Sequence, residues 1–106
     1  GQPWTVSKGF DGAAPISEII PFRQVQGDLE TSEICLWVNG IVRQRALLSE
    51  MIWSVSKTLV YLSGIFTLDR GDLIFMGTPE GVGLVHSGDH LRAEISGVTS
   101  VEFDVL

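Results

Sequence analysis

A threonine within a glycine-rich loop is the first of two candidates for a side chain that could meet a ligand. Thr78 stands between Gly77 and Pro79, directly after a short apolar run at 73–76. The residue before a proline favours an extended backbone, so the Thr78 hydroxyl would be presented in a fixed direction. Gly77 has no side chain, and a ligand could approach its backbone closely. The segment is a candidate ligand site; a tight turn without a ligand is the alternative, which local chemistry alone favours.

A lysine in another glycine-containing loop is the second candidate. Lys8 is followed by Gly9, Phe10 and Asp11. An ammonium group held in such a loop could neutralise negative charge that develops on a substrate. A solvated surface lysine is the alternative, and the spacing alone favours it.

Two groups of possible metal ligands are interpreted as surface residues. Glu102 and Asp104 are two positions apart on a predicted strand and share a face, where two carboxylates could bind a hard cation. A third ligand is not in evident reach. His86 and His90 flank a turn without a recognised spacing of zinc ligands around them. The spacing therefore predicts no metal ligand in this chain.

The elements that would position these residues are mostly β-strands. Asn39-Gly40 lies between two runs of β-type residues at 32–38 and 41–47. This dipeptide predicts a hairpin with a type I′ turn, because both of its residues accept positive φ. A two-residue loop sets the register, and it would place Leu36 opposite Arg43.

One main helix is predicted after this hairpin. Ser49 is a candidate N-cap, and apolar residues at helical spacing predict a helix from about residue 50 to about 64. Residues 1–16 hold three glycines and two prolines and predict an irregular, extended start. Further strands are predicted at 17–22, 73–76, 90–95 and 99–105. The fold class is α+β, mostly antiparallel β.

The composition bounds the function classes. With 106 residues and 44% hydrophobic content, the chain can form one domain with a core. A net charge of −6 argues against a nucleic-acid or anionic membrane partner. The apolar runs are shorter than the about 20 residues that span a bilayer. Cys35 is the single cysteine, so an internal disulfide is impossible, which fits a reducing compartment weakly.

Several segments together, in order through nearly the whole chain, resemble the fumarylacetoacetate hydrolase family. The run Gly71-Asp72 to Gly77-Thr78-Pro79-x-Gly81-Val82-Gly83 resembles the long glycine-rich signature of the family. Leu36-Trp37-Val38-Asn39-Gly40, with Arg43-Gln44, resembles the family's hairpin. Ser49-Glu50-Met51-Ile52 resembles its helix start. Gly1-Gln2-Pro3-Trp4, with Lys8-Gly9-Phe10-Asp11, resembles the loop after its metal site.

The resemblance implies that residues 1–106 are the C-terminal half of a catalytic domain, a β-roll with one main helix. It implies an enzyme that uses Mg²⁺ or Mn²⁺ on small 2-oxo acids, by C–C bond hydrolysis or decarboxylation, like the family's acylpyruvases and oxaloacetate decarboxylases. Lys8 would be the catalytic lysine, and Thr78 and Gly77 would contact the substrate. The family's metal ligands, two glutamates and an aspartate, lie upstream of the segment that Trp4 matches.

Two alternatives remain. One is an isomerase or hydratase of 2-oxo acids from aromatic degradation, with the same fold and metal. The other is an inactive fragment or assembly module, paired with itself as a homodimer or with the missing N-terminal half. Met76 and Gly12 depart from the family pattern, which usually has Thr and a hydroxyl residue there. We expect this segment alone to be inactive, and the protein to be cytoplasmic, or mitochondrial in a eukaryote.

Overall fold

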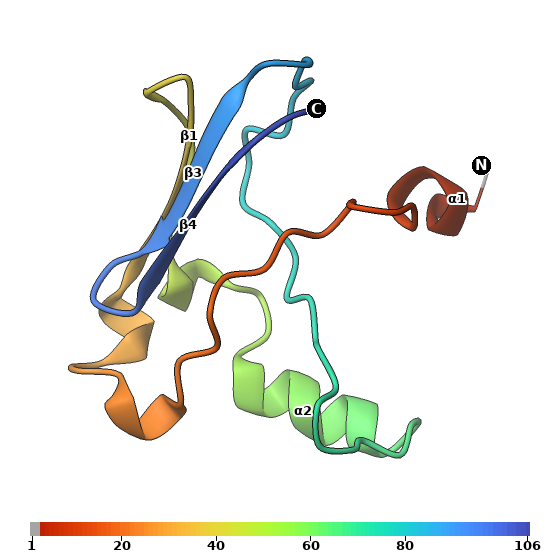
Figure 1. Ribbon diagram of the computed structural model, residues 1–106. Helices are drawn as coiled ribbons and strands as arrows, with labels where there is room; N and C mark the ends of the chain where they lie inside the picture. The colour runs from red at the N-terminus through yellow and green to blue at the C-terminus, as the bar shows by residue number, and fades with distance from the viewer. Residues whose placement is uncertain (1–2) are drawn as a thin grey trace.

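The computed structural model describes residues 3–106, and its centre is an antiparallel sheet of four strands. The first hairpin pairs β1 (Glu33–Val38) with β2 (Ile41–Leu47), and the second pairs β3 (His90–Ile95) with β4 (Thr99–Asp104). The strand order is β2-β1-β3-β4, so the two hairpins join through β1 and β3 (Figure 1). Both predicted hairpins and the α+β class are confirmed.

The first hairpin contains a β-bulge that the sequence did not predict. Asn39 and Gly40 have φ values of 51° and 79°, as the predicted turn requires. Beyond Trp37 the register shifts, and Leu36 lies opposite Gln44 instead of Arg43. The predicted partner of Leu36 is wrong because a bulge adds one residue to β2. As a consequence Gln44 shares a face of the sheet with Leu36.

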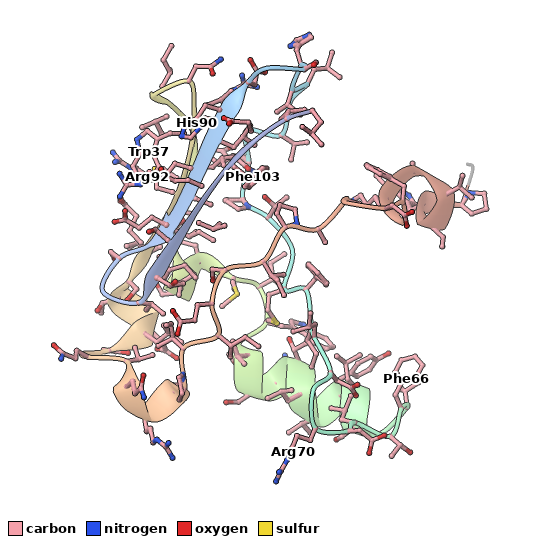
Figure 2. The ribbon with its side chains drawn as sticks, in the orientation of Figure 1. Trp37, Phe66, Arg70, His90, Arg92 and Phe103 are labelled. Carbon is pink, nitrogen blue, oxygen red and sulfur yellow. The ribbon has the colours of Figure 1, made fainter. Side chains whose placement is uncertain are left out.

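The two faces of the sheet differ in character. On one face the Arg92 guanidinium lies 5.5 Å from the Trp37 ring centroid, and its Nε lies 3.5 Å from a Glu102 oxygen. Figure 2 shows Trp37 and Arg92 on the outer side of the sheet and Phe103 on the side of the remaining chain. The inner face is apolar, and it carries Val38 and Leu91, which are buried.

The main helix begins later than predicted. α2 spans Val55–Ser63, and the Ser54 hydroxyl caps it by accepting a backbone hydrogen bond from the third residue along. Leu48–Glu50 instead forms a separate 3₁₀ turn, η3, where the Glu50 carboxylate accepts from the Leu47 backbone N–H at 3.2 Å. The 3₁₀ turn therefore follows β2 directly and separates it from α2. None of the described helices is both long and apolar enough to cross a bilayer.

Three predictions for the irregular parts of the chain are wrong. Residues 17–22 and 73–76 do not form strands, because neither segment pairs with a neighbouring strand within residues 3–106. The expected irregular start contains a short helix, α1 (Trp4–Lys8), which ends at Gly9. The first two residues of that start lie outside the described part of the chain. Figure 1 shows α1 (red) standing apart from the sheet and from α2 (green).

The core is small for a chain of this size. In the described structure the buried hydrophobic residues are Cys35, Val38 and Leu91, whereas Ile52 is 97% exposed and Phe75 is 71% exposed. The accessible surface is 8679 Å². It exceeds by about 2,800 Å² the roughly 5,800 Å² expected for a compact monomer of 11.6 kDa. The chain therefore does not enclose its apolar side chains by itself.

Candidate functional site

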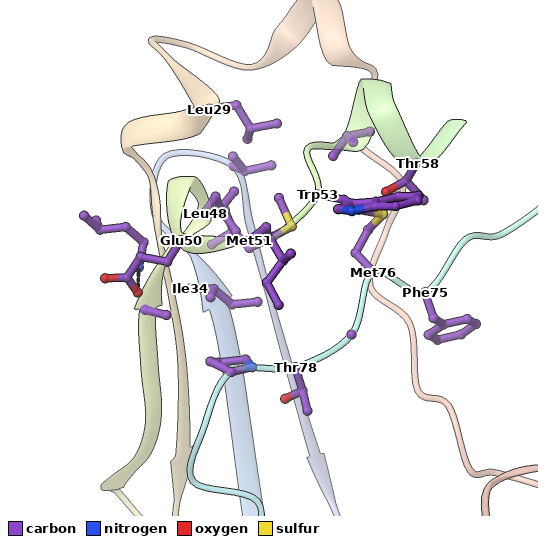
Figure 3. Close-up of a pocket in the computed structure, with 18 of the residues that line it drawn as sticks. Leu29, Ile34, Leu48, Glu50, Met51, Trp53, Thr58, Phe75, Met76 and Thr78 are labelled. Atoms are coloured by element: carbon purple, nitrogen blue, oxygen red, sulfur yellow. Dashed lines mark hydrogen bonds between the residues drawn. The ribbon is translucent and has the colours of Figure 1, made fainter. Parts of the chain in front are cut away.

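A cleft of about 900 Å³ opens on the inner, apolar face of the sheet. Four parts of the chain surround it: the sheet, η3 with the start of α2, the 20–29 segment and the 75–80 segment. Figure 3 shows how its lining side chains gather. Most of the lining is apolar, and its representative members are Leu29, Ile34, Met51, Trp53, Met76 and Ile95.

Gly77 and Thr78 lie on the wall of this cleft. Gly77 has a φ of +92°, a backbone conformation that residues other than glycine rarely adopt. The bend after Met76 therefore depends on this glycine. Thr78 is exposed, and in Figure 3 it lies at the end of the cleft away from Trp53 and Thr58. A hydroxyl at this end can contact a ligand without the ligand entering the apolar interior.

The Thr78 loop is tied to the edge strand β2. The Gln44 side-chain amide nitrogen donates to Thr78 Oγ1 and to the Pro79 carbonyl oxygen, both at 2.8 Å. Arg43 Nη1 donates to the Leu84 carbonyl at 3.3 Å. Gln44 was not singled out from the sequence, since its contact depends on the β2 bulge. The only sequence signal for it was its place directly after Arg43 in the hairpin motif.

A close backbone approach completes this attachment. Gly81 has a φ of +99°, and a Cβ at this position would collide with the Arg43 carbonyl oxygen. A Cβ at Gly83 would lie only 2.7 Å from Arg43 Nη1. Because the Arg43 guanidinium can move and its carbonyl cannot, Gly81 is the glycine that the loop needs in order to lie against β2.

Lys8 is not brought to this cleft. It is the last residue of α1, and its Nζ lies 4.9 Å from the ring centroid of Trp4 in the same helix. Of the residues that the structure describes, those lining the cleft come from position 20 onward. The structure thus unites Thr78 with Gly77 but leaves Lys8 on a separate element.

The described residues do not fit a metal centre. From Pro3 to Leu106, no three His, Cys, Asp or Glu side chains gather in a way that could hold an ion. His90 instead lies between two carboxylates on the outer face, with Nδ1 2.7 Å from Asp104 and Nε2 3.8 Å from Glu102. Both carboxylates are at least half exposed, as is usual for surface ion pairs. We therefore assign no chemical step to a metal bound by these residues.

Residues 1–106 match the family model described as fumarylacetoacetate (FAA) hydrolase, C-terminal. The chain belongs to the fumarylacetoacetate hydrolase family.

Two relatives of the chain are named as enzymes. The mitochondrial oxaloacetate tautomerase of Arabidopsis thaliana is 46% identical over 99% of the chain and 47% of its own length. The oxaloacetate tautomerase YcgM of Escherichia coli is 40% identical over 92% of the chain and 44% of its own length. The chain thus spans about half the length of the curated relatives it matches.

A solved member of the fumarylacetoacetate hydrolase family has the same fold. The fumarylpyruvate hydrolase of Pseudomonas aeruginosa, crystallised in complex with Mn²⁺ and pyruvate, superposes with a TM-score of 0.90 at 42% identity. The match covers 99% of this chain and 45% of that chain. The fold predicted from the resemblance is confirmed, and the uncovered half of that enzyme has no counterpart in these residues.

In the present chain, the carboxylate of Asp89 has a perturbed pKa. The His86 backbone N–H and the Asn39 side-chain amide each donate to the Asp89 carboxylate at 2.8 Å. The His86 bond contributes most to holding the pKa of Asp89 below its usual value, and the Asn39 bond follows. Asp89 thereby connects the turn before β3 to the β1–β2 turn.

Replacing Asp89 by asparagine is expected to destabilise the fold at neutral pH and much less in acid. A carboxyl whose pKa is lower in the folded state stabilises the fold above its unfolded pKa of 3.8, and this stabilisation is lost as the pH falls through the folded pKa. Urea denaturation midpoints at pH 7 and pH 3 measure the difference. Asp11→Asn, outside this turn, is the control. An Asp89→Asn deficit of equal size at both pH values contradicts the assignment.

Proposed function

We propose that the protein carrying this chain is a divalent-metal-dependent enzyme that cleaves a C–C bond of small 2-oxo acids by hydrolysis or decarboxylation. The observation that carries the proposal is the position of Gly77-Thr78-Pro79, which presents an exposed hydroxyl at one end of an apolar cleft. Support comes from the P. aeruginosa relative, which was crystallised with Mn²⁺ and pyruvate. The ion, Mg²⁺ or Mn²⁺, would be held by residues outside this chain.

In this proposal the chain supplies groups that stabilise negative charge. Thr78 donates a hydrogen bond to a substrate oxygen, and Gly77 lets the substrate approach the backbone. Lys8 would be the catalytic cation beside the substrate oxygens. Because Lys8 lies on α1, apart from the cleft, this role requires α1 to pack differently against the rest of the enzyme than it does in the isolated chain.

Isomerisation is the second candidate reaction. The Arabidopsis and Escherichia coli relatives are both named oxaloacetate tautomerases. Tautomerisation and C–C bond cleavage of 2-oxo acids share an enolate in which negative charge develops on the 2-oxo oxygen. A hydroxyl donor at Thr78 serves either reaction, so turnover of each substrate is the measurement that separates them.

Oxalate binding tests the shared part of the proposal, because oxalate is a stable analogue of the enolate of pyruvate. We expect titration calorimetry of the protein that carries this chain to show binding only when Mn²⁺ or Mg²⁺ is present. Lys8→Met should weaken it, whereas Lys57→Met should not; Lys57 Nζ also lies 4.9 Å from a tryptophan ring centroid. Absence of oxalate binding with both ions, together with no turnover of oxaloacetate or acylpyruvates, would exclude this function.

We further propose that the cleft interior is filled by protein, namely the other half of the family fold. A small dianion is poorly stabilised among apolar side chains, so the ligand would occupy only the Thr78 end. The surface excess of about 2,800 Å² is far above the roughly 800 Å² that each partner contributes to an ordinary interface. An excess of this size is expected if one hydrophobic core is shared between two halves of a domain.

Co-expression tests this pairing. The segment preceding the matched region in a family relative, produced with this chain, should give a 1:1 complex by light scattering. Protection of the backbone amides of residues 75–78 and 80 from hydrogen exchange should accompany it. If this chain alone forms a homodimer in which the same amides are protected, the cleft is filled by a second copy of the chain and not by the other half. For location we propose the cytoplasm, or the mitochondrion in a eukaryote, as in the Arabidopsis relative.

A further inference from the structure

We propose that Gln44 is a positioning residue that aims the Thr78 hydroxyl proton at the substrate. This inference rests on the proposed function, because it assigns a role within the same site. It adds a residue that lies behind the loop and is not among those that line the cleft. The directions of two hydrogen bonds made by the Gln44 amide support it.

The Pro79 carbonyl fixes which way the Gln44 amide is turned. A carbonyl oxygen can only accept, so the Gln44 atom that faces it at 2.8 Å must be the NH₂ group. The same nitrogen lies 2.8 Å from Thr78 Oγ1. One amide proton therefore goes to each oxygen, and the Thr78 hydroxyl accepts from Gln44.

This leaves the Thr78 hydroxyl proton free to donate. A threonine hydroxyl has one proton and two lone pairs, and Gln44 occupies one of the lone pairs. With that acceptor direction taken, the rotor is biased to point its proton away from Gln44. The exposed side of Thr78 then presents a donor, which suits a carboxylate, 2-oxo or enolate oxygen.

The β-bulge explains how Gln44 reaches this position. Without the extra residue, Arg43 would lie opposite Leu36 and Gln44 would point to the outer face of the sheet. With it, Gln44 is half-buried on the inner face, under the loop. Bulges that redirect one side chain beside a ligand site recur in enzymes.

Replacing Gln44 by glutamate tests the proposed direction. An ionised carboxylate can only accept, so it would take the Thr78 proton and would be repelled by the Pro79 carbonyl. At pH 7.5 we expect oxalate affinity with Mn²⁺ and kcat to fall about tenfold or more, the effect of losing one aligned hydrogen bond. Gln44→Ala should lose less, because the hydroxyl can still turn to the ligand.

The pH dependence separates positioning from loss of structure. Near pH 5 a growing fraction of the introduced carboxylates would be protonated and could donate again, so the Gln44→Glu deficit relative to the unchanged protein should shrink. Gln24→Glu, the same change at an exposed glutamine outside the cleft, is the matched control. A deficit that does not vary with pH, or one no larger than that of Gln44→Ala, would overturn the inference.

A measurement without ligand keeps this inference separate from the proposed function. Three-bond couplings to the Thr78 methyl group report χ1, which places Oγ1 against the Gln44 amide and so sets where the hydroxyl can donate. They should show one rotamer in the unchanged protein and averaging in Gln44→Ala. If oxalate does not bind but the rotamer responds in this way, the proposed function fails and the positioning stands. If oxalate binds and the rotamer is already averaged before substitution, the positioning fails and the function stands.

Discussion

Replacing Thr78 by valine is expected to lower kcat/KM for a 2-oxo acid by about a hundredfold. Valine keeps the shape of threonine and its preference for an extended backbone before Pro79, but it removes the hydroxyl. Loss of a single aligned donor to a developing oxyanion typically costs about 10²–10³ in rate. Steady-state kinetics on oxaloacetate and an acylpyruvate, with Mn²⁺ present, measure the effect.

Two control variants define what the Thr78 result means. Thr78→Ser retains the hydroxyl and should recover most of the activity. Thr67→Val makes the same chemical change at an exposed threonine outside the cleft and should leave the rate unchanged. A Thr78→Val protein with normal kcat/KM would show that the hydroxyl does not contact the reacting oxygens.

Gly81→Ala is expected to lower the free energy of unfolding by about 3–4 kcal/mol. An alanine at φ +99° is strained by about 1–2 kcal/mol, and its methyl group would also collide with the Arg43 carbonyl oxygen. The loop must then move off β2, which adds about 2 kcal/mol, as overpacking usually does. Denaturant titrations of the protein that carries this chain measure the loss.

Gly71 provides a matched control for the collision. Its φ is also +99°, but a Cβ there would meet open space. Gly71→Ala should therefore cost only the backbone strain, about 1–2 kcal/mol. Equal losses for the two variants would mean that the close approach of the loop to β2 contributes nothing to stability. Gly81→Ala should also reduce activity, because the same displacement separates Thr78 from Gln44.

The incomplete core bears on how all these variants are measured. With Ile52 and Phe75 largely exposed in the isolated chain, much of the apolar surface gains its stabilisation only when covered. Stability differences measured on this segment alone would therefore understate those in the proposed complex with a second half. The cleft residues near α2 should show the largest discrepancy, because they contact the proposed second half.

The sequence by itself determined the elements whose geometry is local. Asn39-Gly40 accepts the two positive φ values of its turn whatever lies around it, so the first hairpin was predictable from two residues. The second hairpin follows from alternation over 90–95 and 99–105, where the strands His90–Ile95 and Thr99–Asp104 form. Gly77-Thr78-Pro79 likewise specifies its own bend, so these residues alone mark the loop as a candidate ligand site.

Only the tertiary structure decided which residues meet. The bulge in β2 has no local signature, yet it determines that Gln44 and not Arg43 lies beneath Thr78. Segments 17–22 and 73–76 have strand-like composition but pair with no strand among residues 3–106, and a strand exists only through hydrogen bonds to a neighbour. Contacts between distant segments depend on the packing of the whole chain and, here, on surface that this chain leaves uncovered.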